Sequence, residues 1–142
     1  MTERRMVSLV LDRLRDDGID AVPDVPFMSR CIDLVIFLDQ DCINVVEFKL
    51  IDWRRGIVQA RDHLLGADHA YVCLPVRKPS SSLLVAFEDS GVGLLFFDPN
   101  REEPFQEVVS PRRSDTIWPP ARNWLIQAAR AGVEKGESAW GY

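Results

Sequence analysis

The sequence predicts an α/β domain in which helices flank a mixed central sheet. Segments with apolar residues at helical spacing alternate with short runs of β-branched and aromatic residues, in the order α-β-β-β-α-β-α-β. The second and third of these strand-like runs are separated by a short turn, which is typical of antiparallel strands in a hairpin. The next run follows a helix, which is the usual connection between parallel strands.

The first helix is expected over residues 3–16. Its apolar residues recur at helical spacing, and they are Met6, Val7, Val10, Leu11 and Leu14. Thr2 is a favourable N-cap for this helix. Glu3 lies one turn before Val7, so it shares the inward face near the start of the helix. An acid in the first turn also interacts favourably with the helix dipole, which gives Glu3 a second interpretation.

A short edge strand is expected over residues 20–22. Pro23 and Pro26 bound this segment. Because Pro lacks the N–H group that a central strand donates to its neighbour, the segment can lie only at the edge of the sheet.

An antiparallel hairpin is expected from residues 31–38 and 42–50, which are rich in β-branched and aromatic residues. A turn centred on Gln40 places Asp33 directly opposite Glu47, since both lie seven residues from that centre. Residues opposite each other in such a pair have Cβ atoms about 4.5–5.5 Å apart. The two carboxylates are therefore expected to be cross-strand neighbours.

The elements after the hairpin have signals of the same kind. Asp52 can cap a helix that Gly66 would end, and Ser80 to Ser82 can cap a later one. The expected elements are a helix over 53–66, a buried parallel strand over 70–74, a short helix within 79–89, a buried strand over 92–97, a possible strand over 105–109 and a final helix that opens at Pro119-Pro120. We expect the final helix to pack on the core or on a second subunit.

The hairpin carries the clearest functional signal. Side chains alternate along a strand, so Lys49 projects from the same side as Glu47, and three ionisable groups converge. Like charges placed opposite each other in an apolar sheet are unfavourable, and a divalent cation between Asp33 and Glu47 would compensate them. Mg²⁺ takes carboxylate and carbonyl oxygens and keeps several waters, one of which an ammonium can orient. This pattern predicts a hydrolytic metal site.

The same residues resemble the PD-(D/E)XK nucleases, also called restriction-endonuclease-like. The matching segments are Ile32-Asp33-Leu34-Val35 and Val46-Glu47-Phe48-Lys49, and similar segments follow at Gln59-Ala60, 67–72 and 91–95, so that the resemblance covers roughly residues 1–98. The chain departs from the family pattern at two places. Ile32 stands where the family has Pro, and His63 stands where the helicase-associated branch has the Tyr of its Gln-x-x-x-Tyr motif.

The resemblance implies a restriction-endonuclease-like αβββαβ core, here with an extra C-terminal helix. It implies Mg²⁺ as cofactor, with Mn²⁺ as a substitute. The implied metal ligands are Asp33, Glu47 and the backbone carbonyl of Phe48, with Glu3 as a ligand or a partner of one, and the implied catalytic residues are Asp33, Glu47, Lys49 and Gln59. Lys49 would position the attacking water.

Helical geometry and the family resemblance disagree over Gln59. At 100° per residue, Gln59 lies about 200° around the helix from Ile57 and so points away from the apolar stripe, on the side of Arg55. In the family, this Gln often lines the active site. His63 and His69 belong to no spaced ligand motif, and we expect them to be exposed or structural.

Basic residues near the hairpin are candidates for binding nucleic acid. They are Arg30, Arg54, Arg55 and Arg61. The formal net charge of −5 argues against indiscriminate binding, because that depends on neutralising phosphates with Lys and Arg. These residues can equally be a solvated charged surface.

Composition favours one globular domain. The chain has 142 residues, 46% hydrophobic and 27% charged, which indicates a single domain over residues 1–133 and a flexible tail over 134–142. It has no signal-peptide pattern and no long apolar run, and its three cysteines form no zinc-binding pair. We therefore expect a cytoplasmic protein that does not enter a membrane.

These observations predict a Mg²⁺-dependent nuclease that hydrolyses phosphodiester bonds, in DNA more than RNA, during restriction, repair or recombination. A homodimer or a larger nuclease complex is the expected assembly by analogy with the family. The alternative is a catalytically inactive nuclease-fold module for binding or assembly. A third interpretation is an ordinary α/β domain in which Glu47 and Lys49 form an exposed ion pair.

Overall fold

Helices and strands follow one another in the predicted order. The computed structural model describes residues 1–39 and 41–140, with side chains up to Val133. The elements are α1 (Glu3–Asp16), β1 (Asp20–Phe27), β2 (Arg30–Phe37), β3 (Ile43–Phe48), α2 (Trp53–Asp62), the 3₁₀ turn η1 (His63–Leu65), β4 (His69–Pro75), α3 (Ser81–Ser90), β5 (Gly93–Phe97), β6 (Phe105–Val109) and α4 (Pro119–Trp140). Gln40, at the centre of the predicted turn, and residues 141–142 of the predicted tail lie outside the described residues.

The strands form a mixed sheet in the order β1-β2-β3-β4-β5-β6. Its middle is parallel, because β3, β4 and β5 run in the same direction, whereas β1, β2 and β3 pair antiparallel and β6 is antiparallel to β5. α2 connects β3 to β4, as expected for a crossover between parallel strands. The predicted α/β class is confirmed.

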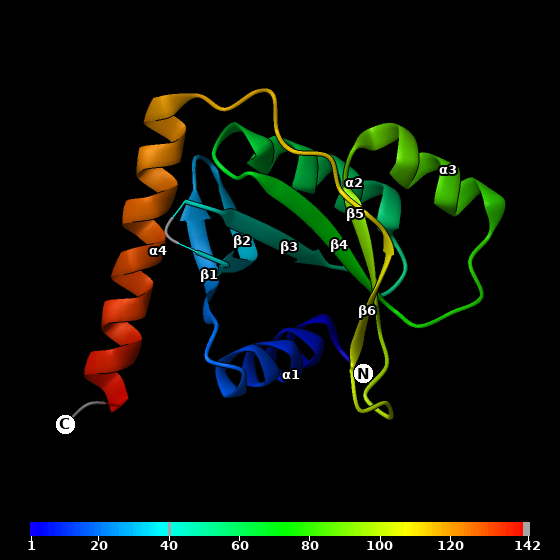
Figure 1. Cartoon of the computed structure of the whole chain (residues 1–142), viewed down its shortest axis with the longest axis horizontal. Helices are drawn as coiled ribbons and strands as arrows, with labels where there is room; N and C mark the ends of the chain where they lie inside the picture. Colours follow the sequence, from blue (N-terminus) through cyan, green and yellow to red (C-terminus); the bar gives the residue numbers. More distant parts are fainter. Residues whose placement is uncertain (40, 141–142) are drawn as a thin grey trace.

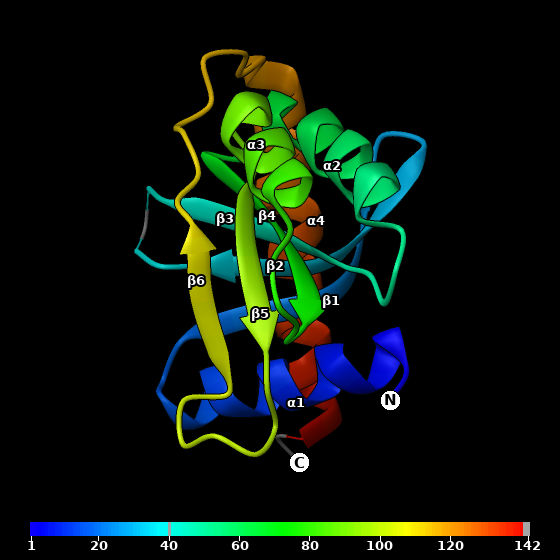
Figure 2. The same cartoon turned by 90° about the vertical axis from the view of Figure 1, so that its right-hand side faces the viewer.

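Helices cover both faces of the sheet (Figure 1). α1 lies on one face, and its Met6, Val10, Leu11 and Leu14 pack with Leu34, Val46 and Phe48. α2, α3 and α4 bury apolar residues in a second cluster, which includes Ile57, Phe87 and Leu125 together with Val35 and Val45. Figure 2, turned by 90°, shows α1 separated from α2 and α3 by the sheet. Val35 and Val45 lie on the α2 face, and alternation places Asp33, Glu47 and Lys49 on that face too.

The register of the β2–β3 hairpin is the predicted one. Leu34 pairs with Val46 and Phe37 pairs with Ile43, so that paired residues are equally far from position 40. Continuing the same register by one residue sets Asp33 opposite Glu47.

β1 is longer than the sequence indicated. We expected a strand over residues 20–22 that ends at Pro23, yet β1 continues to Phe27 and pairs with β2 on both sides of Pro23 and at Pro26. β1 is the edge strand, so one side of its backbone has no strand partner and tolerates residues without an N–H group. The prediction of an edge position is confirmed and the predicted end is wrong.

The helix predicted over residues 53–66 is divided into two parts. α2 ends at Asp62, and η1 continues as one tight 3₁₀ turn before Gly66. The backbone N–H groups of Gly66 and Ala67 both donate to the carbonyl of His63, which closes this turn. The turn leaves the His63 side chain 1% exposed.

α4 continues to Trp140, so the backbone of residues 134–140, which the sequence predicts as part of a flexible tail, is helical. Apart from Gly136, residues 134–139 include good helix formers such as Glu, Lys and Ala, which favour continuation of the helix. α4 packs against β1 and buries Ala121, Leu125 and Ala129, which confirms that it lies on the core. Within residues 1–39 and 41–140, no helix has the length and apolar character needed to cross a bilayer.

Candidate functional site

Two carboxylates meet on the α2 face of the sheet. Glu47, on β3, is 3% exposed, and Asp33, on β2, is partly buried beside it. The two carboxyl groups lie close enough to share a hydrogen bond when one of them carries a proton. The backbone N–H of Phe48 donates to Asp33 Oδ2 at 2.8 Å and so fixes the position of that carboxyl group. The structure therefore brings Asp33 and Glu47 together as the hairpin predicted.

The environment of Asp33 favours its protonated form. Burial, the hydrogen bond with Glu47 and the negative charge of Glu47 raise the pKa of Asp33 from its ordinary 3.8 to about 7, and the Phe48 N–H and the Lys49 charge oppose this rise only in part. A proton shared between the two acids compensates their like charges. A cation at the same position would perform the same compensation.

Lys49 completes the convergence of ionisable groups. Its positive charge lowers the pKa of Asp33 and so opposes part of the rise that burial and Glu47 cause. Its aliphatic stem lies against Gly56 in α2, where an added Cβ would come within 3.0 Å of Lys49 Cγ and of Val72 Cγ1. The missing side chain at Gly56 therefore lets α2 approach the sheet closely enough to hold the Lys49 stem between them.

His63 belongs to this site, although the sequence analysis assigned it an exposed or structural role. Its Nε2 lies 2.6 Å from Glu47 Oε1, and the two side chains are 1% and 4% exposed. The signal that could have found it is its spacing: His63 follows Gln59 by four residues, which is one helical turn.

Gln59 also reaches the site, as the family resemblance implied and the helical wheel did not. With Glu47, His63, Arg30 and Cys31, it lines a cavity of about 170 Å³. Its Oε1 is buried and has no hydrogen-bond partner in the described part of the chain, and the same is true of His63 Nδ1. The cavity is thus lined by polar atoms with unused hydrogen-bonding capacity next to the two acids.

Glu3 lies near the site without joining it. Its carboxylate accepts a hydrogen bond from the backbone N–H of Leu50 at 3.2 Å, just after Lys49. Among residues 1–39 and 41–140, no three His, Cys, Asp or Glu side chains are grouped closely enough to hold a metal ion. The structure therefore does not group Glu3 with Asp33 and Glu47, and the remaining candidate ligands are the two acids and the Phe48 carbonyl.

The four predicted basic residues lie in different places. Arg30 borders the cavity and forms an ion pair with Asp62 at 3.1 Å. Arg54 and Arg55 are exposed on the first turn of α2, where the Arg54 guanidinium stacks over Trp53 at 4.1 Å. Arg61 lines a separate cavity beside α3. Arg30 therefore lies beside Glu47, Arg54 and Arg55 lie on the exposed first turn of α2, and Arg61 lies in a separate cavity.

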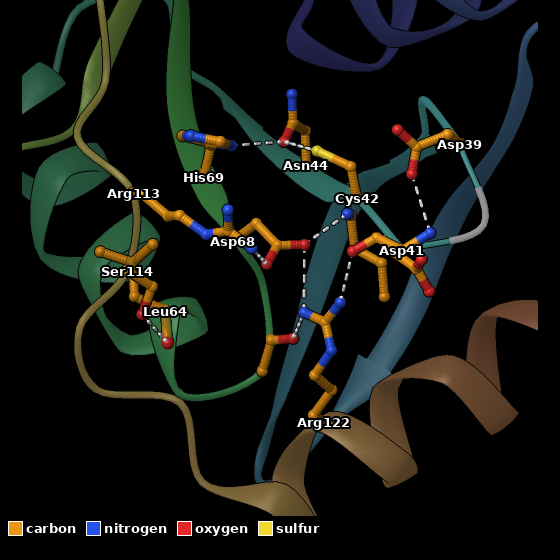
Figure 3. Close-up of polar contacts among 12 residues, drawn as sticks. Asp39, Asp41, Cys42, Asn44, Leu64, Asp68, His69, Arg113, Ser114 and Arg122 are labelled. Atoms are coloured by element: carbon orange, nitrogen blue, oxygen red, sulfur yellow. Dashed lines mark hydrogen bonds and ion pairs between the residues drawn. The ribbon is translucent and has the colours of Figure 1, made fainter.

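A second polar network lies at the other end of β3, around Asp68 (Figure 3). The Asp68 carboxylate, 2% exposed, accepts from the backbone N–H of Ile43 at 2.7 Å and from Arg122 at 3.1 Å. Arg122 also donates to the carbonyls of Gly66 and Asp41. This network joins α4 to the turns that flank β3 and β4, and sequence analysis did not identify it.

Comparison with known proteins supports the fold alone. No model of a known protein family matches the chain, and no curated protein resembles it significantly. The chain is similar to a solved structure described as a protein of unknown function from Silicibacter pomeroyi. The match has a TM-score of 0.71 at 20% sequence identity, and it covers 99% of this chain and 92% of that one.

Proposed function

We propose that the protein is a metal-dependent phosphodiesterase that cleaves nucleic acid, with DNA preferred to RNA as the resemblance to PD-(D/E)XK nucleases implies. The observation that supports this proposal best is the meeting of Asp33 and Glu47 on a buried sheet face with Lys49 beside them. Two acids in mutual contact are costly for a fold unless a proton or a cation compensates them.

The donor set fits a hard divalent cation. Asp33, Glu47 and the Phe48 carbonyl offer oxygen atoms, which are the ligands that Mg²⁺ prefers, and a set this small leaves room for the waters that Mg²⁺ retains. Mn²⁺ accepts the same ligands. When bound, the cation would supply a Lewis acid and lower the pKa of a bound water.

The chain's own residues would then orient the substrate and the water. The Lys49 ammonium would hold the attacking water by hydrogen bonding and stabilise negative charge on the phosphate in the transition state. The stem of Lys49 is held against Gly56, so its ammonium is restricted in position. Arg54 and Arg55, which are exposed on the first turn of α2, would contact the phosphates on either side of the one that is cleaved.

A second candidate function is an inactive nuclease-fold module for binding or assembly. The contact of His63 with Glu47 Oε1 favours this candidate, because it already occupies one oxygen of a proposed metal ligand. As a binding module the protein would bind nucleic acid through Arg54 and Arg55 without cleaving it, and as an assembly module it would do neither. Cleavage distinguishes either module from the phosphodiesterase.

The test is incubation of the purified protein with labelled single-stranded, double-stranded and branched DNA and with RNA, each with Mg²⁺ or Mn²⁺. We expect cleavage of a DNA substrate that needs the cation and disappears in Asp33→Asn. Asp12→Asn, an equally conservative change at an exposed position on α1, is the matched control and should cleave normally. Binding without cleavage would support the inactive module, and cleavage by Asp33→Asn would contradict the proposed site.

A further inference from the structure

His63 is held rigidly at the edge of the site. It lies in η1, its ring packs edge-on against Phe27 with centroids 6.0 Å apart, and its side chain is 1% exposed. A ring that is packed against an aromatic neighbour and closed off from solvent has little freedom to rotate. The position of its Nε2 is therefore set by the fold.

That fixed nitrogen faces one oxygen of Glu47. The Nε2–Oε1 distance of 2.6 Å is short for a nitrogen–oxygen hydrogen bond. An ionised Glu47 can only accept, so Nε2 is the donor in this contact.

The other histidine of the chain, His69, lies near the opposite end of β3 and contacts a neutral side chain. His69 Nδ1 lies 3.1 Å from Asn44 Oδ1 and its side chain is only partly buried. Asn44 is neutral, and the contact belongs to the region around Asp68. A difference between the two histidines in their effect on a metal site would therefore reflect the Glu47 contact rather than the loss of any imidazole.

We propose that His63 is a positioning residue for Glu47, whose N–H donor holds one carboxylate oxygen so that the rest of the carboxylate is directed at Asp33 and at a bound divalent cation. This inference rests on the proposed metal site and adds to it a residue outside the ligand set. Partners that orient a ligating side chain typically change metal affinity by about 10- to 100-fold when they are removed.

Two amide substitutions test this role. In His63→Gln, the side-chain amide nitrogen can take the place of Nε2 and donate to Glu47, whereas in His63→Asn the shorter side chain reaches only the place of Nδ1. Both variants are polar and both lose the ring, so packing losses are matched. Mn²⁺ affinity is measured by calorimetry on the full chain, with His69→Asn as a control at the other end of the sheet.

We expect His63→Asn to bind Mn²⁺ about 10- to 100-fold more weakly than the wild type, and His63→Gln to recover most of that affinity. His69→Asn should bind as the wild type does. Equal affinities of the two His63 variants, at whatever level, would overturn the inference. Absence of Mn²⁺ binding by the wild type would instead overturn the metal site itself, and this result is visible before any variant is compared.

Discussion

Two buried acids near opposite ends of β3 have contrasting surroundings. Asp68, beside the first residue of β3, accepts hydrogen bonds from a backbone N–H group and from the Arg122 guanidinium. Glu47, near the last residue of β3, faces a second carboxylate and one imidazole nitrogen. The first acid is paired with a guanidinium by the fold, whereas the second is set against another negative charge that a proton or an external cation would compensate. The difference indicates that Asp68 stabilises the fold, whereas the contact of Glu47 with a second carboxylate opposes stability, as a strained functional site would.

The largest loss of stability is expected from removing the Asp68 carboxylate. Asp68→Ala leaves the Ile43 N–H without its acceptor and Arg122 without its carboxylate, so we expect the free energy of unfolding to fall by about 3–5 kcal/mol. Urea denaturation measures this loss. Mn²⁺ affinity of the remaining folded protein should be unchanged, because Asp68 lies at the other end of β3. A loss below about 1 kcal/mol would show that the network does not stabilise the fold.

A smaller loss is expected where α2 approaches the sheet. Gly56→Ala introduces a Cβ at 3.0 Å from both Lys49 Cγ and Val72 Cγ1, so these side chains or α2 must shift by a few tenths of an ångström. We expect a destabilisation of about 1–3 kcal/mol, as for overpacking of a tight contact. Cleavage should fall as well, because Lys49 loses its fixed position. Unchanged stability together with unchanged cleavage would show that the close approach is not needed.

The hairpin register could be predicted from sequence because it depends on local information. A turn centre and the alternation of side chains were enough to set Asp33 opposite Glu47. The polar network around Asp68 could not be predicted in this way. Arg122 follows Asp68 by 54 residues, and the contact between them depends on how α4 packs on the sheet.

His63 and β1 were missed for reasons that are also physical. Burial of His63 follows from a helix that tightens into a 3₁₀ turn, which a regular helical wheel does not include. The length of β1 depends on its place at the edge, which decides whether Pro23 and Pro26 are tolerated.

The Asp33–Glu47 pair makes the free energy of unfolding depend on pH. The pKa of Asp33 is raised in the folded state from 3.8 to about 7, so the folded state binds more protons than the unfolded state between these values. The contribution of Asp33 to the free energy of unfolding is therefore fully present below about pH 4 and is lost as the pH rises towards 7. Allowing for the partial exposure of Asp33, we expect a loss of about 1–2 kcal/mol.

Denaturation between pH 4 and pH 8 measures this dependence. Other groups also titrate in this range, so the comparison is with Asp33→Asn, which should lack the contribution. Identical pH profiles of the wild type and Asp33→Asn would show that the two acids do not share a proton.

The smallest effect on stability is expected at Lys49. Lys49→Met keeps the stem that packs on Gly56 and removes only the ammonium, so stability should change by no more than about 0.5 kcal/mol. Cleavage should fall by about 100-fold or more if the ammonium stabilises the transition state. Single-turnover cleavage with saturating Mg²⁺ measures this loss, and full activity of Lys49→Met would exclude Lys49 from the chemistry.

Thermal unfolding of the wild type and of Asp33→Asn, each with and without Mn²⁺, tests most directly whether the Asp33–Glu47 pair is a cation site. Without the cation and at pH 8, we expect Asp33→Asn to be the more stable protein by about 1–2 kcal/mol, because it has lost a like-charge contact. With Mn²⁺, we expect the wild type to be stabilised and Asp33→Asn to show no change. An Asp33→Asn protein that is less stable than the wild type without Mn²⁺, or equally stabilised by it, would contradict the account.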